Sequence, residues 1–167
     1  MRRPDLFRSA VHHEPLLIPL LFETPGGSVA FADRRENFGP VVGAMQEGRT
    51  EASIYRFIEA VFELQSGSAE TEAAAPMWRD NARTIALEFG SAEPPLPMTC
   101  AALSDAKMPT LVVQGAMTFP AFSIMSEKLV HCLPKATMDG VDHDGPYRRQ
   151  DDLAKMISGF LAVVGTK

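Results

Sequence analysis

A run of apolar and β-branched residues, Thr110 to Val113, is the feature that most constrains what this chain can fold into. Pro109 precedes the run and Gly115 follows it, and continuous runs of this kind are typical of strands covered on both faces of a parallel sheet. The apolar spacing after it predicts a helix over Phe122–Leu133, a strand over Ala136–Val141 and an amphipathic helix over Leu153–Val164. Strand, helix, strand and helix in this order predict a parallel βαβα unit, so the fold class is α/β.

One further strand is expected near the start of the chain. Residues Leu6 to His13 lean apolar, and Glu14 ends the strand because the residue before a proline disfavours helix. A turn is predicted at Pro25–Ser28, where two glycines follow a proline.

The middle of the chain, from about residue 36 to residue 90, has the spacing of helices. One continuous apolar stripe contains Ile54, Phe57, Ile58, Val61 and Phe62. A second helical stretch over Glu70–Glu88 is expected to break at Pro76, because proline lacks the backbone N–H that a helix interior needs. The proline-dense segment Ala92–Pro97 is the best candidate for a boundary between subdomains.

Composition excludes several classes of protein. A chain of 167 residues with 46% hydrophobic residues is expected to fold around one core. A net charge of −5 with scattered arginines and lysines argues against nucleic acid as a partner. No apolar run approaches the length of a membrane span or a secretory leader, so a cytoplasmic protein is expected, with Cys100 and Cys132 as reduced thiols.

Several motifs together resemble the C-terminal half of an α/β-hydrolase. They are P-T-L-V-V-Q-G at 109–115, L-P-x-A at 133–136, G-x-x-H-x-G-P at 140–146 and F-L at 160–161. The segment Pro4–Pro15 resembles the strand that follows the nucleophile helix of that family, and Met77–Ala82 matches part of its helical cap. The resemblance implies a partial α/β-hydrolase fold of about three parallel strands: first strand and exit loop at 1–21, helical cap at 22–104 and C-terminal βαβα part at 105–167.

The resemblance places the general base at His143, on the loop after the last strand. Histidine suits this role because its ordinary pKa near 6.5 lets it accept and return a proton around neutral pH. Without the resemblance, the residue types alone favour a surface-loop histidine between Asp142 and Asp144. Three adjacent loop residues rarely converge on one ion, so no metal and no cofactor are expected.

The acid departs from the common pattern of the family. Thr118 stands where the usual aspartate would be, and a threonine cannot hold an imidazolium by charge. Some members, haloalkane dehalogenases among them, take this carboxylate from the end of the strand after the nucleophile helix, where Glu14 stands. Glu14 would then orient His143 and stabilise its protonated form, or it is a strand-end carboxylate that only solvates the start of the cap.

The nucleophile is missing from its customary motif. The family's serine lies in G-x-S-x-G, and no such string occurs in the chain. Ser28 in Gly26-Gly27-Ser28 lacks the final glycine and reads as a turn residue, while Ser123 and Ser126 fall on the helix after the second strand.

The expected function is therefore hydrolysis of a small apolar ester, lactone or similar carbonyl substrate by a Ser-His-acid mechanism. The half that bears the nucleophile would be absent, so the chain alone is expected to be inactive. The first strand should leave one edge open. Three explanations of this open edge are considered. The reading frame is truncated, the edge pairs with a second copy or another chain, or the cap folds over the edge. Truncation is favoured. The competing hypothesis is a noncatalytic binding or interaction module derived from the same fold.

Overall fold

The structure is a computed structural model that describes residues 6–62, 64, 67–90, 97–116, 118–141 and 149–165. The chain divides into two compact units, one formed by Met1–Phe31 with Pro95–Lys167 and the other by Ala32–Pro94. The first unit is of the α/β class, and the second is helical in its described residues.

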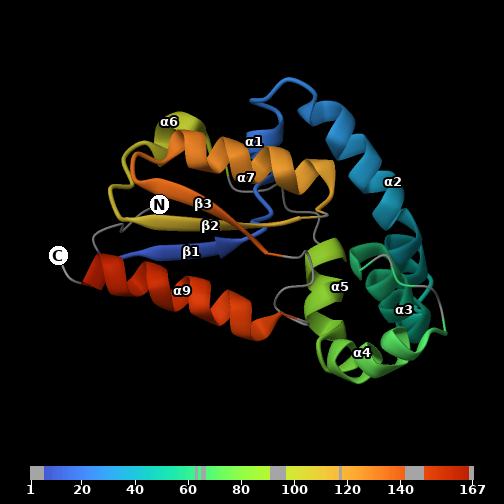
Figure 1. The fold of residues 1–167 in the computed structure, drawn as a ribbon. Helices are drawn as coiled ribbons and strands as arrows, with labels where there is room; N and C mark the ends of the chain where they lie inside the picture. Colours follow the sequence, from blue (N-terminus) through green and yellow to red (C-terminus); the bar gives the residue numbers. More distant parts are fainter. Residues whose placement is uncertain are drawn as a thin grey trace. The chain divides into compact units, whose positions relative to one another are not determined.

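A three-stranded parallel sheet forms the centre of the first unit (Figure 1). Its strands are β1 (Ala10–His13), β2 (Thr110–Gly115) and β3 (Ala136–Val141), in the order β1-β2-β3. Ala10, Thr110 and Ala136 are in register, so the strands begin level with one another. The first four residues of β2 are buried, as a central strand covered on both faces requires. The parallel arrangement predicted from the sequence is confirmed.

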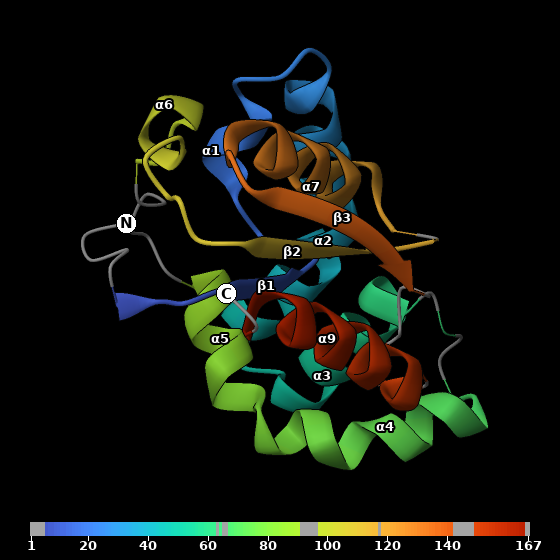
Figure 2. The ribbon, with the colours of Figure 1, turned by 60° about the vertical axis from the view of Figure 1, so that its left-hand side comes forward.

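Helices cover both faces of this sheet (Figures 1 and 2). The helices α1 (Ile18–Leu21), α6 (Cys100–Leu103) and α7 (Pro120–Cys132) lie on one face. There Leu20, Leu103 and Leu129 pack with Val112 in one core cluster. The terminal helix α9 (Gln150–Gly165) lies on the other face. Its side chains reach a second cluster that contains Leu111, Val113 and Val141.

Helix α9 covers its face of the sheet incompletely. Leu153, Met156 and Phe160 pack against the sheet, but no residue of α9 is buried. Leu161 is 46% exposed and Val163 is 66% exposed, so part of the apolar stripe of this helix faces solvent. Asp151 and Asp152 lie in the first turn of the helix, where a negative charge is favourable beside the free N–H groups.

The outer edge of β1 has no strand partner among the described residues, because β2 pairs with both β1 and β3. Such an edge presents unpaired backbone N–H and C=O groups that can pair with another strand. The open edge expected from the sequence is therefore present in the described part of the sheet.

The two cysteines form a disulfide, so the prediction of reduced thiols was wrong. Thr99 begins α6 by accepting the backbone N–H of Ala102 with its side chain, which places Cys100 in the first turn. Cys132 is the last residue of α7, and the two Cα atoms lie 4.9 Å apart. Sequence spacing does not reveal this proximity, because the two cysteines are separated by 32 positions of sequence, with β2 and most of α7 between them.

The second unit contains α3 (Thr50–Phe62), α4 (Ala69–Asp80), α5 (Ala82–Gly90) and most of α2 (Gly27–Gln46). Ile54 and Ile58 of the predicted stripe are buried in α3. The indole of Trp78 packs against the rings of Phe57 and Phe62, with centroid distances of 4.9 and 5.9 Å. These aromatic side chains thus fix α4 against α3.

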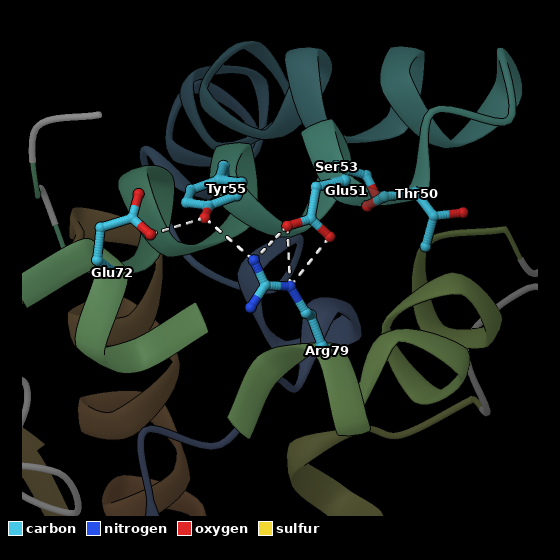
Figure 3. Close-up of polar contacts among 6 residues, drawn as sticks. All are labelled: Thr50, Glu51, Ser53, Tyr55, Glu72 and Arg79. Carbon is cyan, nitrogen blue, oxygen red and sulfur yellow. Dashed lines mark hydrogen bonds and ion pairs between the residues drawn. The ribbon is translucent and has the colours of Figure 1, made fainter. Parts of the chain in front are cut away.

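A polar network also joins α3 to α4 (Figure 3). The Nε of Arg79 donates to both carboxylate oxygens of Glu51, at 2.8 and 3.0 Å, and Tyr55 donates its hydroxyl to Glu72 at 3.1 Å. The Arg79 guanidinium lowers the pKa of Glu51, while the bond to the Glu72 carboxylate raises the pKa of Tyr55. Arg79 and Glu51 are exposed to solvent, so the network orients the two helices and adds little to stability.

Two local predictions in the chain are corrected. Pro76 does not break its helix: it lies inside α4, where Thr71, Ala74 and Ala75 are buried and outweigh the one lost helix bond. The helix ends instead at Asp80, and the next residue, Asn81, caps it with a side chain that donates to the carbonyl of Met77.

Ser28 is a helix residue and not a turn residue, since α2 begins at Gly27. Gly26 makes the turn with φ of 79°, a value that glycine adopts readily. A Cβ at Gly27 would lie 1.8 Å from the carbonyl oxygen of Leu21, so this close approach of the chain also requires glycine.

Candidate active site at the carboxyl edge of the sheet

Glu14 stands where β1 ends, as the sequence predicted. Its backbone N–H donates to the carbonyl of Val113 at 3.0 Å and so extends the pairing with β2 by one bond. Its φ is 43°, which makes it the one non-glycine residue with positive φ among the described residues. A conformation of this kind costs on the order of 1–3 kcal/mol and persists only where the surroundings impose it.

The carboxylate of Glu14 is held over the end of the central strand. Its Oε1 accepts the backbone N–H of Gly115 at 2.9 Å, across 101 positions of sequence. Hydrogen bonds from backbone N–H groups favour the charged form of a carboxylate and fix its direction. The strained backbone and this bond together position one carboxylate oxygen at the carboxyl edge of the sheet.

The end of β3 lies beside the same point. Gly115 and Val141 are in register, and the N–H of Ala116 donates to the carbonyl of Val141 at 2.8 Å. The segment 142–148, which contains His143, Asp142 and Asp144, lies outside the described residues. The assignment of His143 as a base therefore stays a prediction.

Thr118, at the position of the family's usual acid, follows β2 closely. Its backbone N–H donates to the carbonyl of Gly115 at 3.4 Å. Its Oγ1 is buried and forms no hydrogen bond within the part of the chain that the structure describes. A buried hydroxyl of this kind can donate or accept one hydrogen bond but supplies no charge.

The remaining histidines lie away from this point or belong to the sheet. His12 pairs in register with Val112 and His13 with Val113, so the two side chains alternate between the faces of the sheet, as expected. Burial lowers the pKa of His12, which keeps its ring neutral near neutral pH. His131 is exposed on α7 next to the disulfide.

A short chain of polar contacts on the α7 side was not predicted. Gln114 donates its Nε2 to the Ser123 hydroxyl at 3.1 Å, and this hydroxyl donates to Glu127 at 3.1 Å. Ser123 thus joins the end of β2 to α7. The alternation of β2 could have indicated which face Gln114 occupies, but no sequence signal names its partner.

No group of three or more histidine, cysteine, aspartate or glutamate side chains gathers at metal-ligand spacing anywhere in the described ranges. Within those ranges, no helix has both the length and the apolar character needed to cross a membrane.

Comparisons with known proteins do not assign this chain to a family. The chain matches no family model, no curated protein sequence and no solved structure. The candidate site therefore has to be judged from its own residues.

Proposed function

We propose that the first unit carries the general base and the orienting acid of a hydrolase of the α/β-hydrolase type. His143 is the base, Glu14 is the acid, and the substrate is a small apolar ester, lactone or similar carbonyl compound. The observation that supports this most is the bond between the Glu14 carboxylate and the Gly115 N–H. It holds a charged group at the edge of the sheet where the segment bearing His143 begins.

The position of the acid suits the catalytic role. Ligands of open parallel sheets bind outside the carboxyl ends of the strands, and Glu14 lies at this end. His143 follows Val141 by two residues, and two residues of extended chain span at most about 7 Å. The proposal rests on this short separation in sequence, because the base and Glu14 have to meet at one edge of the sheet.

Each group then has one task in the reaction. The His143 imidazole accepts the proton of the attacking hydroxyl and returns it to the leaving oxygen. The Glu14 carboxylate accepts the other ring N–H and stabilises the imidazolium that forms in between. A hydroxyl at Thr118 can orient a neighbouring group but cannot take over this electrostatic role.

The serine of such a mechanism is not found in its usual motif within the 167 residues. In the proposed arrangement, the strand that presents it pairs with the open edge of β1, parallel to the other three strands. A second copy or a separate polypeptide could supply that strand. The chain by itself would then retain only the chemistry of a positioned imidazole.

This reduced chemistry is measurable with an activated ester, because an imidazole promotes hydrolysis of p-nitrophenyl acetate without a serine. The 167-residue chain should hydrolyse this ester faster than its His143→Ala variant, and Glu14→Gln should lower the rate at pH 7. His131→Ala is the matched control, since it removes an exposed histidine of α7 and leaves His143 and Glu14 in place. Equal rates for the parent chain and His143→Ala would refute the assignment of the base.

The second candidate is a noncatalytic binding or interaction module. The absence of G-x-S-x-G from the chain favours it. This hypothesis predicts that His143→Ala lowers the rate no more than His131→Ala does, and that Glu14→Gln leaves the rate unchanged.

A further inference from the structure

A pocket of about 1310 Å³ lies in the first unit between α9 and the sheet. Met156, Phe160 and Val163 of α9 line it, and Leu111 of β2 and Thr137 of β3 lie opposite them. It is separate from Glu14, which does not line it. This volume exceeds the roughly 300–1,000 Å³ of ordinary small-molecule sites, so the pocket has room for a ligand of the size of a fatty acid.

The wall of the pocket that α9 forms is mostly apolar and is only partly buried. Met156 and Phe160 contact the sheet cluster with part of their surface, whereas Val163 is 66% exposed. Covering exposed apolar surface stabilises a complex by about 25 cal/mol for each Å² removed from water. This wall therefore favours an alkyl chain that lies along α9.

A glycine in the middle of α9 keeps the pocket open. Gly159 lines it, and a Cβ built at this position has no heavy atom within 4 Å. Glycine in a helix interior costs about 1 kcal/mol relative to alanine. Among the described residues, no atom packs close enough to require a glycine here, and a larger side chain would fill the space beside it.

The charged groups of the pocket are mostly cationic, although the chain as a whole carries a net charge of −5. Among the described residues, Arg8, Lys135 and Lys155 line it, against one acid, Asp139. None of the three cations forms an ion pair with another described residue. The carbonyl end of α9 also lies here and offsets part of the positive potential, but a surplus of two cationic side chains over acids remains.

Two of the cations mark one end of the pocket. Lys135 immediately precedes β3 and Arg8 precedes β1 by two residues, so both lie at the amino edge of the sheet. An apolar wall with cations at one end is complementary to a molecule with one alkyl chain and one anionic head.

We propose that this pocket binds a long-chain fatty carboxylate, with the alkyl chain along α9 and the carboxylate near Arg8 and Lys135. This binding activity goes beyond the proposed hydrolase function and does not depend on it, because it uses the opposite edge of the sheet. A lysine or arginine beside a carboxylate supplies a charge-assisted hydrogen bond, while the α9 wall supplies the apolar area.

Titration of the 167-residue chain with dodecanoate, followed by calorimetry, tests the proposal. Gly159→Phe should fill the open space and weaken binding by at least about tenfold, since the ring occupies the path of the alkyl chain. Ser158→Phe is the matched control, because it adds the same ring at the neighbouring exposed position, which does not line the pocket. It should leave the dissociation constant within about twofold.

The head group is tested with a second ligand and a second variant. Arg8→Gln combined with Lys135→Gln should weaken dodecanoate by at least about fivefold and leave dodecanol unchanged, because only the carboxylate uses the two cations. Far-UV circular dichroism checks that each variant keeps its helices. The proposal is overturned if dodecanoate does not bind at millimolar concentration, if Gly159→Phe binds as the parent chain does, or if the double variant weakens both ligands equally.

Discussion

Loss of the Cys100–Cys132 disulfide should lower the free energy of unfolding of the first unit by about 4 kcal/mol. The bond closes a loop with a sequence separation of 32 residues. Restriction of the unfolded chain by a loop of this length amounts to roughly 12 cal/mol/K, or about 4 kcal/mol at 25 °C. The loop contains β2 and most of α7, so the bond closes the region that holds the centre of the sheet.

Urea unfolding with and without a reductant measures this effect. A change of about 4 kcal/mol should move the midpoint by roughly 2 M urea, given ordinary urea dependences. Far-UV circular dichroism is the suitable signal, because Trp78 is the chain's one tryptophan and belongs to the second unit. Hydrogen exchange of peptides from β2 and α7 should show that the lost protection lies in the first unit.

The variant with both Cys100→Ala and Cys132→Ala is the control. It should unfold at the lower midpoint in either condition and should not respond to the reductant. The reasoning would be refuted if the oxidised parent chain showed two reactive thiols, or if its midpoint did not change on reduction.

Two further outcomes follow from local geometry. Gly27→Ala should lower the free energy of unfolding by at least about 1–3 kcal/mol, because its Cβ would meet the Leu21 carbonyl. Gly43→Ala should raise the free energy of unfolding by up to about 1 kcal/mol, because a Cβ at this helix position has open space around it. Thermal melting of the two variants separates these outcomes, and equal melting temperatures would contradict the clash. Burial lowers the pKa of His12 below 6.5, so the unfolded state takes up a proton more readily and stability should fall as pH drops below about 6.5. His12→Asn should make the fall measured by urea unfolding smaller, and an unchanged pH dependence would show that His12 does not contribute.

The sheet could be predicted from the sequence because its signals are local. The apolar run at Thr110–Val113 marks a covered central strand, and β3 occupies the predicted residues 136–141. The helix ends were less predictable. Pro76 reads as a helix breaker in isolation, but buried neighbours in α4 keep the helix continuous through it.

The candidate site was predictable only in part. Pro15 indicated that β1 ends at Glu14, yet the bond to the Gly115 N–H joins residues that are 101 positions apart. The disulfide likewise depends on how α6 and α7 pack, which no spacing of two cysteines encodes. Contacts of this kind arise from tertiary packing, and no local sequence pattern indicates them.

The central claim, that Glu14 is the charged partner of His143, is tested most directly by the titration of His143 itself. The chain has only four histidines, so the imidazole signals in a proton NMR spectrum are few. The signal that disappears in His143→Gln belongs to His143. Glu14→Gln keeps an oxygen that can accept the Gly115 N–H but removes the charge. The account predicts that the pKa of His143 falls in Glu14→Gln, because the protonated imidazole loses its nearby anion. An unchanged pKa would contradict it.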